Sequence, residues 1–165
     1  MLDIGTGSGC IAISLALESK NLKVSAVDIS AAALEIARYN ADNLGVNINL
    51  IKADIFNYQF DSDYDVIISN PPYVLKSEKK LMRANVLEHD PTMALFVEDG
   101  DPLIFYEQII KLSISQLKKN GLIYFEINER FGSEVAELLK VNNFSNVSIV
   151  KDLNGKDRFV FGFKN

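Results

Sequence analysis

The sequence predicts an α/β fold: a seven-stranded, mostly parallel sheet with one antiparallel strand near the C-terminus. Two patterns support this fold class. Short apolar runs of strand character alternate with longer helical segments along the 165 residues, which is typical of βαβ units and parallel sheets. The last two apolar runs are joined only by a turn containing Asn154 and Gly155, so the chain should add an antiparallel strand there.

Strands are expected where four to six mostly apolar residues lie between polar or turn-forming residues. In chain order these runs are 1–4, 23–28, 48–51, 65–69, 122–127, 147–151 and 158–163. The turn sequence Asn120-Gly121 leads into the fifth run.

Four helices are expected beside these strands, at 9–18, 31–44, 102–117 and 131–142. Ser30 suits the N-cap of the second helix and Gly45 its C′ position. Pro102 lies near the first turn of the third. The stretch 70–101 has little periodicity and follows a strand, so we expect it to be functional.

The composition is that of one globular domain. Apolar residues make up 48% and charged residues 24% of the chain, which excludes a disordered or collagen-like protein. Seventeen basic and twenty-two acidic side chains give a net charge of −5, so no sequence-wide basic field attracts nucleic acid or anionic lipid. No apolar run reaches the roughly 18 residues of a membrane helix, and no signal-peptide pattern is present. A cytoplasmic domain is therefore expected.

Single reactive side chains have simple interpretations here. Cys10 is the one cysteine, which excludes an internal disulfide and a multi-cysteine zinc site; we expect it to be a small buried packing residue. His89, the one histidine, lies between Glu88 and Asp90 and is interpreted as an ion-paired loop residue, so no metal site is expected. A basic patch, interpreted as a solvated surface, consists of Lys76, Lys79, Lys80 and Arg83.

A glycine-rich loop follows the first strand. The segment Asp3-Ile4-Gly5-Thr6-Gly7-Ser8-Gly9 opens the first helix, and its glycines let the backbone turn tightly and approach a ligand. Asp28 ends the next strand, nineteen positions after Gly9, where a carboxylate can accept hydrogen bonds from both ribose hydroxyls of an adenosine. An acid at position 3 would repel a phosphate and suits the amino group of a methionine. The loop is similar to that of the Rossmann-like S-adenosylmethionine methyltransferases.

The fourth strand is followed by Asn70-Pro71-Pro72-Tyr73. A planar, conjugated NH₂ group is a poor nucleophile, and its two hydrogens must be held while it attacks. The Asn70 side-chain oxygen and the Pro71 carbonyl can each accept one hydrogen. The prolines stiffen the loop and remove competing donors, and the Tyr73 ring can cover the planar group. These residues are the candidate catalytic group.

Together these motifs resemble the HemK/PrmC family, the glutamine N5-methyltransferases of class-1 peptide chain release factors. Further motifs that carry the resemblance follow in order. They are Glu-His-Asp-Pro-Thr-Met-Ala-Leu at 88–95, Asp-Gly at 99–100, Phe-Tyr at 105–106 and Lys-Asp-Leu-Asn-Gly-Lys-Asp-Arg at 151–158. The resemblance covers the whole chain.

The resemblance implies a Rossmann-like class I methyltransferase fold with S-adenosylmethionine as the cofactor. It also implies that the substrate is the glutamine of the release factor's Gly-Gly-Gln loop, with Asn70 and Pro71 binding its amide and Tyr73 packing over it. The cofactor residues that it implies are Asp3, Gly5, Thr6, Gly7, Ser8, Gly9, Asp28, Ile29, Asp54, Ile55, Phe56 and Asn70. Ile55 and Phe56 stand where relatives often have a tryptophan, and Asn128 where glycine is common.

Two alternatives remain open. An RNA or DNA amino-methyltransferase can share Asn-Pro-Pro-Tyr, although the net charge of −5 disfavours it. The second alternative is a non-catalytic domain that binds the cofactor or a partner. Members of the family carry a helical domain ahead of the catalytic one, and this sequence opens almost directly on the glycine loop. We therefore expect residues 1–165 to be a single catalytic domain truncated at its N-terminus.

Overall fold

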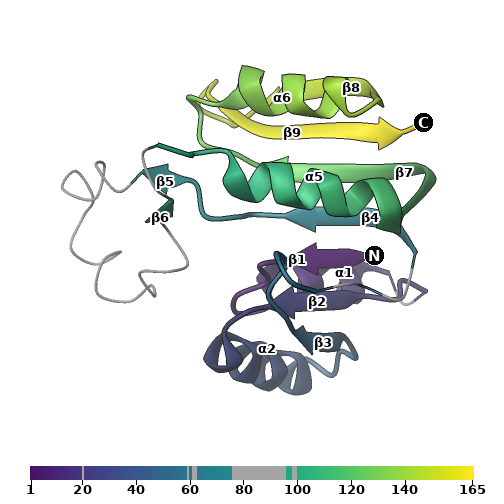
Figure 1. The fold of residues 1–165 in the computed structure, drawn as a ribbon. Helices are drawn as coiled ribbons and strands as arrows, with labels where there is room; N and C mark the ends of the chain where they lie inside the picture. Colours follow the sequence, from purple (N-terminus) through teal and green to yellow (C-terminus); the bar gives the residue numbers. More distant parts are fainter. Residues whose placement is uncertain (20, 59, 61–62, 76–95, 98–99) are drawn as a thin grey trace.

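A seven-stranded sheet forms the centre of the computed structural model, which describes residues 1–19, 21–58, 60, 63–75, 96–97 and 100–165. Its strands are β1 (Leu2–Ile4), β2 (Ser25–Asp28), β3 (Asn49–Lys52), β4 (Tyr64–Ser69), β7 (Leu117–Glu126), β8 (Phe144–Lys151) and β9 (Asp157–Lys164). They lie in the order β3-β2-β1-β4-β7-β9-β8 (Figure 1). Among the seven strands of this sheet, β9 alone runs opposite to the others, which confirms the predicted fold class.

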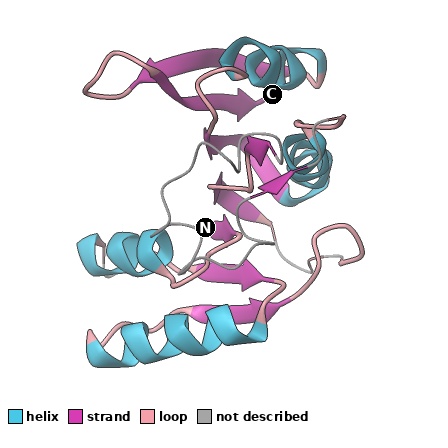
Figure 2. Ribbon diagram, turned by 90° about the vertical axis from the view of Figure 1, so that its left-hand side faces the viewer, coloured by secondary structure: helices cyan, strands magenta, loops and turns pink. Residues whose placement is uncertain are grey.

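Helices cover both sides of the sheet (Figure 2). They are α1 (Cys10–Glu18), α2 (Ala31–Asn43), α5 (Ile104–Gln116) and α6 (Gly132–Val141). Alternate side chains of the central strands point to opposite faces of the sheet, where they join two different apolar clusters. Ile67 and Phe125 pack in one cluster with α5 and α6, whereas Ala26 packs in the other with Ala12 of α1.

Local sequence signals account for the ends of α2. The Ser30 hydroxyl accepts a hydrogen bond from Ala33 N at 3.2 Å, as an N-cap does. At the other end Gly45 adopts a φ of +64°, and Val46 N donates to Ala41 O at 2.9 Å. This is the bond pattern of a Schellman motif, so both predicted caps are confirmed.

The start of β7 differs from the prediction. The strand begins at Leu117 rather than at 122, and its register against β4 shifts between Tyr64 and Val66. Asn120 has a φ of +62°, and a Cβ on Gly121 would lie 2.7 Å from Leu117 Cγ. The expected turn is therefore an irregularity within a longer strand, because the chain resumes its pairing with β4 after it.

Two short strands, β5 (Val74–Leu75) and β6 (Phe96–Val97), form a separate parallel pair that the sequence did not indicate. They lie beside the ends of the main strands in Figure 1. The segment 88–95, His89 and the basic patch Lys76–Arg83 lie outside the described residues.

The expectation that Cys10 is buried is wrong. Cys10 is exposed, because the buried residues of α1 are Ala12 and Ile13, and its first residue faces outward. It lines a depression of about 440 Å³ between α1 and α2, together with Ser14 and Asn40. Within the described part of the chain, no helix is long and apolar enough to span a membrane.

Candidate active site

The two motif loops meet where the strand order reverses. From β1 the chain proceeds outward through β2 and β3, then returns to β4 on the other side of β1. Ligands of such sheets bind at the carboxyl ends of the strands at this switch point. The buried Ser69 hydroxyl donates to Ile4 O at 2.7 Å, and a Cβ on Gly5 would lie 3.9 Å from Asn70 O. The glycine loop and the Asn70–Tyr73 loop are therefore neighbours.

Left-handed backbone at three glycines shapes the first loop. Gly5, Gly7 and Gly9 have φ values of +72°, +56° and +82°, a region that residues with a Cβ rarely adopt. A Cβ on Gly9 would lie 2.9 Å from Ile13 Cδ1, so this glycine lets α1 and the loop pack closely. Within the described part of the chain, a Cβ on Gly7 would meet nothing within 4 Å.

Asp3 is a buried carboxylate beneath the loop. It is only 1% exposed. Its Oδ2 accepts a hydrogen bond from the Thr6 hydroxyl at 2.7 Å, while its Oδ1 has no hydrogen-bond partner among the described residues. Burial raises the pKa of Asp3 to about 6, against the opposing effect of the Thr6 hydrogen bond. A buried carboxylate in this state is a ready partner for a cationic group.

Asp28, at the end of β2, ties that strand to the glycine loop. Its Oδ2 accepts from Gly7 N and its Oδ1 from Ser30 N, both at 2.9 Å. Each carboxylate oxygen has a second lone pair, so Asp28 can still accept hydrogen bonds from a ligand. The prediction of a carboxylate beside the glycine loop agrees with this geometry. The sequence did not reveal that Asp28 also orients the loop.

Asp54 and its neighbours extend the site along the same edge. Asp54 accepts hydrogen bonds from Phe56 N at 3.0 Å and from the Asn57 amide at 2.7 Å. Phe56 is 42% exposed. Its ring packs edge-on against Phe105, with centroids 5.5 Å apart. An exposed ring at this position can provide an apolar wall, as can Ile55, which packs against the core.

Ile29, Thr6 and Ser8 complete the predicted cofactor set. Ile29 is half exposed directly after Asp28. Thr6 is buried through its bond to Asp3, and Ser8 O accepts from the Asn40 side chain at 3.0 Å. These contacts give Thr6 and Ser8 structural roles in the loop, while Ile29 offers apolar surface.

The predicted catalytic loop presents its side chains unequally. Asn70 is exposed, Pro71 is buried and Pro72 is half-buried. The Tyr73 hydroxyl donates to Glu126 Oε1 at 3.0 Å, and Tyr73 O accepts from the Asn128 side chain at 3.3 Å. Asn70 is thus accessible from solvent, whereas Tyr73 is anchored to the end of β7.

Three residues at this edge were not predicted as site residues. Glu126 holds Tyr73, and its backbone oxygen also accepts from the buried Tyr106 hydroxyl at 3.2 Å. Arg158 interacts electrostatically with both Tyr73 and Glu126. The segments containing Glu126 and Arg158 are recognisable in the sequence, but no local pattern links them to the loop after β4. Among the described residues, no group of three or more His, Cys, Asp or Glu side chains is arranged to hold a metal ion.

The features of this site fit an adenosine that carries an amino acid. Asp28 ends β2 beside the left-handed backbone of the glycine loop. Asp54 follows β3, and the buried Asp3 has a carboxylate oxygen with no partner among the described residues. No basic side chain was found in the loop to neutralise a phosphate. The residues therefore suit hydroxyl and ammonium groups better than a polyphosphate.

Comparison with known proteins identifies similar sequences. The family model of the methyltransferase small domain matches residues 1–95. A release factor glutamine methyltransferase of Flavobacterium psychrophilum is 48% identical over 97% of this chain and 56% of its own length. One of Bacteroides thetaiotaomicron is 46% identical over 97% of this chain and 58% of its own length. The chain therefore spans little more than half the length of these relatives.

Solved structures share the fold. A methyltransferase from Pyrococcus furiosus superposes with a TM-score of 0.72 at 20% identity, over 99% of this chain and 74% of its own. A ribosomal protein L11 methylase from Lactobacillus delbrueckii gives 0.68 at 22% identity, over 99% and 69%. These likenesses confirm the predicted class I methyltransferase fold.

Proposed function

Because the chain belongs to the methyltransferase small domain family, we propose that it methylates the side-chain amide nitrogen of a glutamine in a release factor. The methyl donor is S-adenosylmethionine, and the glutamine is that of the Gly-Gly-Gln loop of a class-1 peptide chain release factor. Relatives 46–48% identical to this chain, named release factor glutamine methyltransferase, support the choice of substrate. Residues 1–165 act as a single catalytic domain, and the reaction takes place in the cytoplasm.

One observation carries the proposal: an exposed asparagine directly beside the glycine loop. Asn70 follows the last residue of β4, and its backbone oxygen lies 3.9 Å from the Cβ position of Gly5. An acceptor-rich loop beside a nucleoside site is the arrangement that aligns an NH₂ group with a methyl donor.

The glutamine amide needs orientation more than it needs a base. Its nitrogen is conjugated to the carbonyl, so the lone pair is weakly nucleophilic. The Asn70 side-chain oxygen and the Pro71 carbonyl accept the two N–H hydrogens and direct the lone pair toward the donor. Both bonds strengthen as positive charge develops on nitrogen, which stabilises the transition state. The nitrogen then releases one proton to water.

S-adenosylmethionine supplies an electrophilic methyl group on a sulfonium sulfur. Asp28 would accept hydrogen bonds from its ribose hydroxyls, and Ile55 and Phe56 would flank its adenine, near Asp54. Asp3 would balance its ammonium group, which suits a buried carboxylate with a free oxygen. These residues would therefore bind the cofactor, while Asn70 and Pro71 would orient the glutamine amide.

Transfer of labelled methyl groups tests the proposal. The protein is incubated with methyl-labelled S-adenosylmethionine and, separately, with a release factor or ribosomal RNA. Label on the Gly-Gly-Gln peptide is the expected result. Label on RNA alone would support an RNA amino-methyltransferase, and cofactor binding without transfer to any substrate would support a non-catalytic domain.

Substitution of Asn70 tests the mechanism. Asn70→Ala should reduce kcat on the order of 10²-fold, the usual effect of losing one transition-state hydrogen bond, while cofactor affinity is largely retained. Asn49→Ala is the matched control, because Asn49 is an exposed asparagine of β3 at the far edge of the sheet. Normal turnover in Asn70→Ala would refute the amide-holding mechanism.

A further inference from the structure

The turn between β8 and β9 lies at the same edge of the sheet as the catalytic loop. Since β9 is antiparallel to both β7 and β8, β8 ends and β9 begins where the parallel strands have their carboxyl ends. Ile127 N donates to Arg158 O at 2.9 Å, which ties the start of β9 to the end of β7. The turn segment 151–158 is therefore next to the residues that hold Tyr73.

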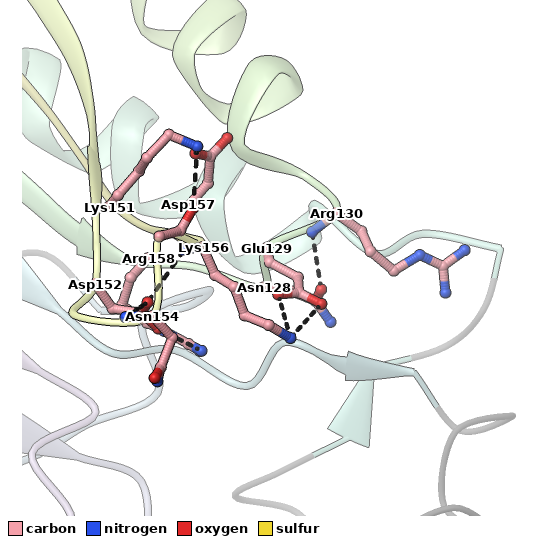
Figure 3. A network of polar contacts seen from close by, with 10 residues as sticks. Asn128, Glu129, Arg130, Lys151, Asp152, Asn154, Lys156, Asp157 and Arg158 are labelled. Atoms are coloured by element: carbon pink, nitrogen blue, oxygen red, sulfur yellow. Dashed lines mark hydrogen bonds and ion pairs between the residues drawn. The ribbon is translucent and has the colours of Figure 1, made fainter.

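Asp152 organises this turn and fixes Arg158 (Figure 3). Its Oδ1 accepts from Asn154 N at 2.8 Å and from Lys156 N at 3.1 Å. Its Oδ2 accepts from both Nε and Nη2 of Arg158 at 3.3 Å. The backbone N–H of Lys156, followed by that of Asn154 and the Arg158 side chain, lowers the pKa of Asp152. The carboxylate thus stays ionised and holds two atoms of one guanidinium, which restricts its orientation.

Tyr73 is held at two points by the end of β7. Its hydroxyl donates to Glu126 Oε1 at 3.0 Å, and its backbone oxygen accepts from the Asn128 side chain at 3.3 Å. Burial, followed by the charge of Glu126, raises the pKa of Tyr73 to about 12, and Arg158 opposes this rise. The hydroxyl is therefore a donor throughout the physiological pH range.

Glu126 needs a countercharge to stay in place. Glu126 is half-buried, and a carboxylate partly removed from water is favoured there only when a cation or donors compensate it. Arg158 interacts electrostatically with Glu126 as well as with Tyr73. Without Arg158, moving the Glu126 carboxylate toward water would lower its free energy, and the Tyr73 hydroxyl would then lose its acceptor.

We propose that Asp152 and Arg158 are positioning residues, which act through Glu126 to fix the Tyr73 ring in the catalytic loop. The inference rests on the proposed function, in which that ring packs over the glutamine amide. Small displacements of a reacting group lower the rate strongly, so the ring must be held in the plane that the amide requires. Asp152 and Arg158 therefore contribute to turnover without touching the substrate.

Three variants of the intact protein test this. Arg158→Ala should lower kcat on the order of 10-fold with little change in the affinity for S-adenosylmethionine. Arg158→Lys should recover part of the loss, because the charge is restored but not the planar fork. Lys156→Ala is the matched control, since Lys156 belongs to the same turn but pairs with Glu129 at 2.8 Å; its kcat should be unchanged.

A double-mutant comparison with Tyr73 distinguishes a positioning role of Arg158 from a general contribution of Arg158 to stability. If Arg158 acts through the Tyr73 hydroxyl, Arg158→Ala should cause no further loss of kcat in a Tyr73→Phe background. Additive losses would overturn the proposal, as would an unchanged kcat in Arg158→Ala.

A measurement that needs no substrate distinguishes failure of this inference from failure of the proposed function. With ¹³C-labelled tyrosine, the Tyr73 Cζ resonance should move in Arg158→Ala and Asp152→Ala but not in Lys156→Ala. An unmoved resonance in Arg158→Ala would overturn the inference. If the resonance moves but the wild-type protein methylates no glutamine, the proposed function fails while the holding of Tyr73 by Arg158 stands.

Discussion

Replacing Asp3 by asparagine should make the free protein more stable at neutral pH and weaken its affinity for S-adenosylmethionine. Burial raises the pKa of Asp3 from 3.8 to about 6, although the Thr6 hydrogen bond opposes the rise. At about 1.4 kcal/mol per pKa unit, the difference means that folding disfavours the ionised carboxylate by about 3 kcal/mol at pH 7. The carboxylate would hold this unfavourable charge ready for the cofactor's ammonium group.

The pH dependence determines the direction in which the free energy of unfolding should change. The folded protein binds the Asp3 proton more tightly than the unfolded chain does. Its contribution to the free energy of unfolding is thus fully present below pH 3.8 and is lost as the pH rises through about 6. Asparagine can accept the Thr6 hydrogen bond but does not titrate. The stability difference between Asp3→Asn and the wild type should therefore be small near pH 4 and approach about 3 kcal/mol at pH 7.

Urea unfolding at a series of pH values measures this difference. Asp65→Asn is the matched control, because the Asp65 side chain is 74% exposed and its hydrogen bond with Lys118 lowers its pKa. The control should therefore lose stability relative to the wild type as the pH rises. Calorimetry should show S-adenosylmethionine binding Asp3→Asn about tenfold more weakly, as expected for one lost charge-assisted hydrogen bond. Parallel pH profiles for wild type and Asp3→Asn would refute the reasoning.

Two further substitutions probe the loop and the turn. Gly9→Ala would place a Cβ 2.9 Å from Ile13 Cδ1 at a φ of +82°, so urea unfolding should show a loss of about 1–3 kcal/mol; an unchanged midpoint would mean that the loop relaxes freely. Leu153 is fully exposed in the turn beside the site, so Leu153→Ser should leave stability and kcat unchanged and raise the KM for the release factor. Steady-state kinetics would exclude a substrate contact there if KM stayed the same.

Local rules predicted most of the fold. The caps of α2 follow from Ser30 and Gly45, and the apolar runs lie in strands with ends within a few residues of those expected. The errors arose where contacts between distant segments determine the exposure of a residue or the start of a strand. Cys10 is exposed because the buried residues of α1 are Ala12 and Ile13, and its first residue faces outward. The early start of β7 depends on pairing between Leu117 and Tyr64, which a single segment does not reveal.

The candidate site likewise contains residues that the sequence predicts and residues that it does not. The glycine loop and Asp28 were recognisable because a motif and an acid at a fixed spacing share one βαβ unit. That Asp28 also binds Gly7 N was not predictable, since the bond depends on the exact approach of two strand ends. The interaction between Glu126 and Arg158 was still harder to predict from the sequence. Thirty-two positions separate them, and only the antiparallel register of β9 on β7 brings them together.

The single antiparallel strand explains how distant residues can reach the catalytic loop. In an all-parallel sheet, a new strand would begin at the amino edge, and its first residues would lie far from the site. Because β9 runs the other way, its second residue, Arg158, lies at the carboxyl edge, and the turn before it supplies Asp152. The turn between β8 and β9 therefore lies at the same edge as the glycine loop but on the other side of β4. A fold that reverses one strand can bind the cofactor on one side of the switch point and orient Tyr73 from the other.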